Sequence, residues 1–188
     1  MLFILVAGLP GSGKSVFSSV AREMGLPVYT MGDVIREEVA RRGLPPTPES
    51  FMRVASELRR LYGPTVVAER TLERILREAP GEVVVVDGVR SLDEVRVFRG
   101  RGEAVIVAIH ASPRTRFERL RSRGRPGDPK TWEEFERRDL TELGFGLGNV
   151  IALADYMLVN DGIGIDEFRA EAERLLRAVI RGRAARPG

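Results

Sequence analysis

The sequence contains no cysteine and only one histidine among its 188 residues. The lack of cysteine excludes a disulfide framework and any zinc site built on thiolates. The single histidine, His110, ends an apolar segment, and we interpret it as a structural residue rather than a catalyst. Any chemistry in this chain therefore has to rest on other side chains.

Long apolar segments are also absent, since no run approaches the roughly 20 residues that a membrane-spanning helix needs. The first apolar run, Leu2–Ala7, has no basic segment before it and no cleavage site after it, so it lacks the form of a signal peptide. We therefore expect a cytoplasmic protein without a membrane partner.

Lysine is scarce, because all but Lys14 and Lys130 of the 30 basic residues are arginine. Arginine suits bidentate contacts with phosphate oxygens and surface ion pairs. The net charge is only +3, and neither a nucleic-acid-binding motif nor a basic stripe is visible. We expect a small-molecule partner and no nucleic acid, with the oligomeric state open.

The segment Gly8–Ser15 matches the phosphate-binding loop pattern G-x-x-x-x-G-K-[ST]. An apolar strand segment precedes it and helical spacing follows it, which is the context that the pattern requires. Glycines let the backbone N–H groups form an anion cradle at a helix N-terminus. The sequence therefore predicts ATP binding, with Lys14 on the β- and γ-phosphates and Ser15 on Mg²⁺. The predicted nucleotide contacts are Gly8, Pro10, Gly11, Ser12, Gly13, Lys14 and Ser15.

Five short apolar segments separated by helical patterns predict an α/β fold, with a five-stranded parallel sheet and helices on both faces. We expect one P-loop domain over residues 1–188, in three layers. Three successive helices interrupt the alternation, and we interpret residues 31–79 as an insertion that covers a substrate. The predicted strands are 2–7, 27–30, 82–88, 104–110 and 156–160, and the predicted helices are about 15–24, 32–42, 48–61, 65–78, 91–98, 113–123, 131–139, 149–153 and 166–181.

Asp87 ends the third apolar segment and is followed by Gly88. In proteins with a phosphate-binding loop, an acidic residue at this place holds Mg²⁺ directly or through water. The alternative is an aspartate that caps a turn. Beside the phosphate loop we favour the metal role, so Ser15 and Asp87 form the predicted Mg²⁺ site.

Four further segments resemble elements of nucleoside-monophosphate-kinase-type P-loop kinases. Gly32–Arg36 is similar to the GDxxR element of adenylate kinases, and Asp87–Arg90 is similar to their DGFPR element. Arg119–Arg123 is similar to the arginine pair that opens their lid. Ala154–Asn160 resembles the AD-x-x-x-x-N strand of dephospho-CoA kinases. The resemblance covers most of the chain and fits best an archaeal kinase-like group of unassigned activity.

This resemblance implies a helical acceptor-binding insertion at 31–79, a lid region at 123–139 and a role for each arginine. The segment after Asp87 lacks the family's proline and is one residue shorter, and the lid is short and free of cysteine. These departures bear on the identity of the acceptor. The implied roles are acceptor binding for Asp33, Arg36 and Arg90, donor-nucleotide binding for Arg119 and Asn160, and phosphoryl transfer for Lys14, Arg123, Arg125 and Arg137 or Arg138.

Glu94 lies four residues after Arg90, where adenylate kinases carry a glutamine that reads the adenine edge. An ionised glutamate can only accept hydrogen bonds, so in that role it would disfavour AMP as the acceptor. The alternative is local, because Ser91 and Glu94 have the spacing of a capping box, in which the glutamate accepts a backbone N–H. Both interpretations stay open at this point.

Taken together, these patterns predict an ATP- and Mg²⁺-dependent phosphotransferase acting on a nucleotide or nucleotide-like acceptor. One alternative is a dephospho-CoA-type kinase, which phosphorylates a ribose hydroxyl. A second alternative is a nucleotide-binding regulator that hydrolyses ATP slowly. The lid arginines and the Asp33/Arg36 pair favour a kinase over a regulator.

Overall fold

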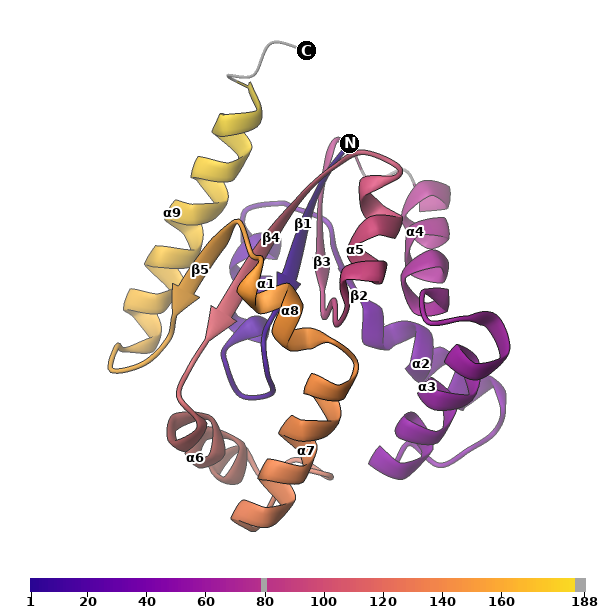
Figure 1. Ribbon diagram of the computed structural model, residues 1–188. Helices are drawn as coiled ribbons and strands as arrows, with labels where there is room; N and C mark the ends of the chain where they lie inside the picture. Colours follow the sequence, from indigo (N-terminus) through magenta and orange to yellow (C-terminus); the bar gives the residue numbers. More distant parts are fainter. Residues whose placement is uncertain (79–80, 185–188) are drawn as a thin grey trace.

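The computed structural model describes residues 1–78 and 81–184. Figure 1 shows a central sheet with helices on both faces. The strands all run parallel, in the order β2-β3-β1-β4-β5. This arrangement confirms the predicted α/β fold. The strands are β1 (Leu2–Ala7), β2 (Val28–Thr30), β3 (Val83–Asp87), β4 (Glu103–His110) and β5 (Tyr156–Val159).

The helices agree with the predicted bounds to within a few residues, apart from α7. This helix continues to Gly144 instead of ending near Asp139, because no glycine or proline interrupts the chain before Gly144. None of the helices in the described ranges is long and apolar enough to cross a membrane. The helices are α1 (Lys14–Glu23), α2 (Met31–Arg41), α3 (Pro48–Tyr62), α4 (Val66–Glu78), α5 (Leu92–Arg99), α6 (Pro113–Arg123), α7 (Trp132–Gly144), α8 (Leu147–Ala152) and α9 (Ile165–Ala184).

The central strand β1 is buried over its whole length. Leu5 pairs with Val86 of β3 on one side and with Ile106 of β4 on the other. The even-numbered residues of β1 pack in one core cluster with α1 and α9, and the odd-numbered residues pack in a second cluster with α4, α5 and α8. Since helices cover both faces, the strand is apolar throughout.

The three helices between β2 and β3 are packed onto the second core cluster. Met31 of α2 and Val54 and Leu58 of α3 are buried there together with residues of β1. Figure 1 shows these helices grouped on one side of the sheet. The insertion predicted from the sequence therefore shares the core of the sheet. Its expected last residue, number 79, lies outside the described residues.

The carboxyl ends of the parallel strands meet at one edge of the sheet, where open α/β sheets bind their ligands. Gly8 follows β1, Gly88 follows β3 and Asn160 follows β5. Figure 1 shows α6 and α7 beyond the arrowheads of β1 and β4. The segment predicted as a lid thus lies over the edge of the sheet that carries the phosphate-binding loop.

Candidate active site

A cavity of about 580 Å³ lies at this edge of the sheet. Its walls come from the phosphate-binding loop, the segment after β3, the helices α6 and α7, and the segment after β5. The structure therefore brings together residues from the whole length of the chain. The predicted site residues that line the cavity are Gly8, Pro10, Gly11, Gly13, Lys14, Ser15, Asp87, Arg90, Arg119, Arg123, Arg138 and Asn160.

The phosphate-binding loop depends on glycine where it enters α1. Gly13 has a φ of 114°, in the left-handed region that glycine adopts without strain. A side chain at this position would also overlap the amide of Asn160. That amide donates a hydrogen bond from Nδ2 to the carbonyl oxygen of Ser12 at 2.9 Å. Asn160 therefore anchors the loop to the end of the sheet.

The side chain of Lys14 folds back over its own loop. Its Nζ donates to the carbonyl oxygens of Gly8 at 2.5 Å and Leu9 at 3.3 Å. Burial lowers the pKa of the Lys14 ammonium, an effect that the nearby Asp87 carboxylate opposes. The hydroxyl of Ser12 is buried without a hydrogen-bond partner. The loop thus holds an ammonium whose bonds go to carbonyls and an unsatisfied hydroxyl, which fits an anionic ligand.

Ser15 and Asp87 both line the cavity, as the predicted Mg²⁺ site requires. Ser18, in α1, donates from its hydroxyl to Oδ2 of Asp87 at 3.0 Å and so orients the carboxylate. Within residues 1–78 and 81–184, no three His, Asp or Glu side chains cluster as a metal cage. Mg²⁺ commonly takes one or two protein ligands, with phosphates and water supplying the rest. The two residues fit a cation that binds together with a nucleotide.

Arg119 of α6 lies beside the segment that follows β5. Its Nη2 donates to the backbone oxygen of Asn160 at 3.0 Å and to its side-chain Oδ1 at 3.2 Å. Three apolar residues that follow β5 in the sequence also line the cavity, namely Ile163, Ile165 and Phe168. An arginine beside apolar side chains suits a planar base. Sequence reasoning missed the three apolar residues, because no motif marks them.

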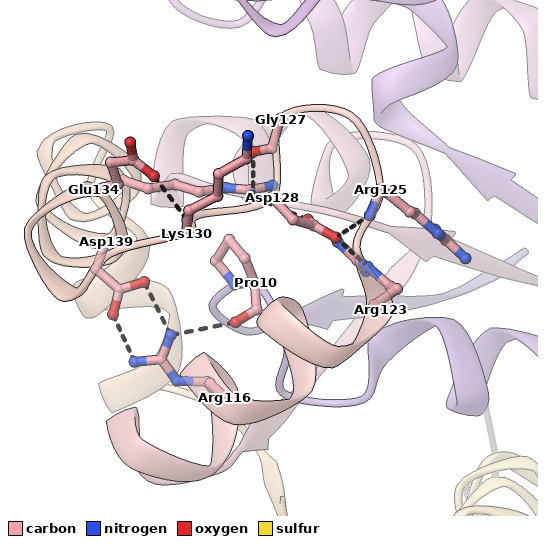
Figure 2. Close-up of polar contacts among 10 residues, drawn as sticks. Pro10, Arg116, Arg123, Arg125, Gly127, Asp128, Lys130, Glu134 and Asp139 are labelled. Carbon is pink, nitrogen blue, oxygen red and sulfur yellow. Dashed lines mark hydrogen bonds and ion pairs between the residues drawn. The ribbon is translucent and has the colours of Figure 1, made fainter.

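The segment between α6 and α7 is held together by Asp128, which the sequence did not single out. Arg123 donates from Nε to Oδ2 of Asp128 at 2.9 Å and from Nη2 to Oδ1 at 2.5 Å. Arg138 approaches Oδ1 at 3.5 Å, and the backbone N–H of Arg125 donates to Oδ2 at 3.0 Å. Figure 2 shows Arg123 and Arg125 meeting this carboxylate. Burial raises the pKa of Asp128, but Arg123 and the other donors outweigh it and hold the pKa below its usual value.

The same segment contacts the helical insertion. Gly127 has a φ of 83°, and a side chain there would overlap the ring of Pro48 at the start of α3. The chain between Arg123 and Arg138 therefore bridges from α6 over to α3. Two arginines predicted to act on the transferring group are held by Asp128 in this arrangement.

We predict that Asp128→Asn raises trypsin cleavage after Arg123 about fivefold, because the partly exposed arginines lose an ion pair worth about 1 kcal/mol. A bisubstrate analogue with Mg²⁺ should slow the cleavage of the parent protein, since lid closure orders the segment. The rates are read from gel band intensities. Asp93→Asn, on the exposed face of α5, is the matched control and should match the parent. Equal rates with and without the analogue would argue against a lid.

Arg90 and Glu142 form an ion pair in the wall of the cavity. Nε of Arg90 donates to Oε2 of Glu142 at 2.7 Å, and Nη1 donates to the Gly88 carbonyl at 3.1 Å. Burial raises the pKa of Glu142, but the charges of Arg90 and Lys14 and the Arg90 hydrogen bond outweigh it and hold that pKa below its ordinary value. Glu142 lies in the last turn of α7, beyond the predicted end of that helix, so the sequence analysis did not include it.

Several predicted site residues lie outside the cavity lining. Asp33 and Arg36 are half-exposed and form an ion pair with each other. The side chains of Arg125 and Arg137 are not part of the lining, and both residues are exposed. Of the two arginines considered for α7, Arg138 is the one that lines the cavity. The roles of Asp33 and Arg36 in acceptor binding stay predictions.

Glu94 is 1% exposed and does not line the cavity. Its Oε2 accepts the backbone N–H of Arg90 at 2.7 Å, and its Oε1 accepts from Nη2 of Arg59 at 3.3 Å. Ser91 caps α5 by accepting the N–H of Glu94 at 3.1 Å. Glu94 thus takes part in capping α5, but its carboxylate accepts the backbone N–H of Arg90 and not that of Ser91, as a capping box would require. This arrangement gives it no base-reading position.

Comparisons with known proteins show which class of fold this chain has. Residues 7–136 match the family model described as an AAA domain. The fold resembles the shikimate kinase from Bacteroides thetaiotaomicron, with a TM-score of 0.57, 20% identity and coverage of 94% of this chain and 98% of that one. It also resembles a gluconokinase from Sinorhizobium meliloti 1021, with a TM-score of 0.54, 22% identity and coverage of 95% and 93%. The chain therefore has a P-loop kinase-like fold.

A closer relationship identifies the family. The chain is 69% identical over 175 residues to the UPF0200 protein of Hyperthermus butylicus, and the aligned region covers 93% of each of the two chains. The protein therefore belongs to the UPF0200 family of archaeal proteins. Together with the family model and the fold, this relationship confirms the resemblance to P-loop kinases and to an archaeal kinase-like group.

Proposed function

We propose that the protein is an ATP- and Mg²⁺-dependent phosphotransferase acting on a nucleotide or nucleotide-like small molecule. The observation that carries this proposal is one cavity lined by Lys14, Asp87, Arg119, Arg123 and Arg138 at the end of the central strand. Phosphoryl transfer needs donors for a triphosphate, a ligand for its cation and positive charge around the transferred group. These residues supply each of the three.

The roles follow from the chemistry of the side chains. The loop N–H groups and Lys14 bind the β- and γ-phosphates, and Ser15 and Asp87 hold Mg²⁺. Mg²⁺ draws charge from the phosphate oxygens when it is bound. Arg123 and Arg138 release Asp128 and bind the transferring phosphoryl group. Fixed cations stabilise the negative charge that spreads over the oxygens of that group. Closure of the segment between α6 and α7 excludes water.

A regulator that hydrolyses ATP slowly is the weaker alternative. The cavity continues past the phosphate-binding loop to Arg90 and Glu142, which leaves room for a second substrate. A dephospho-CoA-type kinase is a special case of the proposal, since its acceptor is nucleotide-like. We also propose a cytoplasmic location, where ATP and Mg²⁺ are supplied, and an acceptor that is neither a nucleic acid nor a membrane component.

The test is a panel of acceptors with labelled ATP and Mg²⁺. AMP, GMP, CMP, UMP and dephospho-CoA are each incubated with the protein, and products are separated chromatographically. We expect one acceptor to be phosphorylated about 100-fold faster than ATP is hydrolysed without acceptor, since a bound acceptor is held in line while water is excluded. ATP hydrolysis that no acceptor changes would support the regulator instead.

A further inference from the structure

The wall of the cavity beside Arg90 carries a carboxylate, that of Glu142. Within the described ranges, only Asp87 and Glu142 are acidic residues that line this cavity. Asp87 is the proposed metal ligand. Glu142 projects from the last turn of α7, is 20% exposed at its side chain and is within electrostatic reach of Lys14. A second carboxylate thus faces the space where an acceptor would meet the donor phosphate.

The other carboxylates near this edge have different partners. Asp33 pairs with Arg36 outside the cavity. Glu94 is buried against Arg59 and a backbone N–H, and Asp139 is held by Arg116. Glu142 is therefore the acidic side chain in the cavity to which the proposed function has assigned no role.

The charges on the acceptor side are already balanced. A carboxylate lies against Arg36, Arg59 and Arg90 alike. At the phosphate-binding loop, by contrast, the hydrogen bonds of Lys14 and Arg119 go to oxygens of backbone carbonyls and of an amide. The carboxylate paired with Arg123 and Arg138 is Asp128, in the segment between α6 and α7. A phosphate group placed at Arg90 would lie against the carboxylate of Glu142 or displace it, and the two negative charges would repel each other. A hydroxyl group would instead donate a hydrogen bond to that carboxylate.

We propose that the acceptor presents a hydroxyl group and that Glu142 receives its proton during transfer. The inference rests on the proposed function and narrows its acceptor class. The acceptor oxygen forms a bond to the γ-phosphorus while the bond from that phosphorus to the β,γ-bridging oxygen breaks. The hydroxyl proton passes to the Glu142 carboxylate, and ADP leaves. The product is a phosphate ester, whereas a phosphate acceptor would give an anhydride.

The surroundings of Glu142 suit this role. Arg90 fixes one carboxylate oxygen at 2.7 Å, which orients the group toward the cavity. The charged groups that face it are Arg90, Lys14 and Arg138. Because all three are cations, they hold the pKa of Glu142 low and keep the carboxylate ionised, so that its oxygens are free to accept the hydroxyl hydrogen bond. The same charges make a proton taken up during transfer easy to release. The proton then leaves to solvent when the segment between α6 and α7 opens.

The first experiment identifies the class of product. Adenosine, guanosine and dephospho-CoA offer hydroxyls, while AMP, GMP, CMP and UMP offer a terminal phosphate as well. Each is incubated with the parent protein and Mg·ATP, and the product is examined by phosphorus NMR, which separates esters from anhydrides. We expect an ester. An anhydride would overturn this inference and leave the proposed function standing, and no product from either class would overturn both.

The second experiment uses Glu142→Gln, which keeps the shape and removes the base. We expect kcat to fall about 100-fold or more, as for loss of a general base, with KM and Kd for Mg·ATP within about twofold. Glu142→Asp should recover part of the rate. Glu136→Gln, exposed on the same helix, is the matched control. The thermal midpoint of each variant shows that it is folded. A kcat for Glu142→Gln within threefold of the parent would overturn the role of Glu142.

Discussion

Replacement of Lys14 by alanine is expected to lower phosphoryl transfer about 1,000-fold while leaving the protein folded. The ammonium is the cation of the phosphate-binding loop, and its hydrogen bonds go to the carbonyls of Gly8 and Leu9 rather than to a carboxylate. Its removal therefore takes charge from the donor site without leaving an unpaired buried carboxylate. The transfer rate is measured with labelled ATP and the best acceptor of the panel.

Lys130 provides the control, because it is the only other lysine and it is exposed. Lys130→Ala should keep the transfer rate and the thermal midpoint of the parent. Lys14→Ala should keep the midpoint and lose the rate. Transfer by Lys14→Ala within tenfold of the parent would remove the phosphate-binding loop from the role of donor site.

The fold was predictable because its signals are local. The residues of a strand covered on both faces are apolar throughout, so segments such as Leu2–Ala7 and Val83–Asp87 stand out. The loop between β1 and α1 has a fixed spacing of glycine, lysine and serine. Capping residues marked helix starts correctly at Thr47, Ser91 and Thr131.

The candidate site was predictable only where a motif spans neighbouring residues. Glu142 was missed because its partner, Arg90, lies in the segment between β3 and α5, far away in the sequence. Asp128 was missed because its partners come from two separate helices and no spacing in the sequence marks them. Glu94 illustrates an intermediate case. Its capping function was weighed from the sequence, but its contact with Arg59 joins residues 35 positions apart, one in α3 and one in α5, that only the tertiary fold brings together. The position of Arg138 rather than Arg137 likewise depends on which face of α7 turns inward.

Errors in the predicted ends of helices affected the list of site residues more than errors in which helices exist. α7 was predicted to end near Asp139, and the additional turn to Gly144 carries the residue on which the further inference depends. A short error in a boundary therefore removed a site residue from consideration. The sequence signal was present, since residues 140–143 contain no glycine or proline, but a helix end has no sharp marker when the next glycine lies several residues away.

Loss of Arg116 should destabilise the protein strongly. It is 2% exposed and donates to Asp139 through Nη1 at 2.9 Å and Nη2 at 2.5 Å. It also donates to the carbonyl of Pro10 at 3.2 Å, and its guanidinium lies 4.9 Å from the ring centroid of Phe135. Figure 2 shows this arginine between α7 and the phosphate-binding loop. One side chain therefore joins α6, α7 and the loop.

Arg116→Ala is expected to lower the free energy of unfolding by about 3 kcal/mol, because it leaves the largely buried carboxylate of Asp139 without its partner. For a chain of this size the thermal midpoint should fall by about 10 °C. Arg114→Ala is the matched control on the same helix, since Arg114 is 88% exposed and should contribute less than about 1 kcal/mol. The double variant Arg116→Met with Asp139→Leu should recover much of the loss, as apolar replacement removes the unpaired charge. A midpoint for Arg116→Ala within 2 °C of the parent would show that this buried pair does not hold the lid helices to the loop.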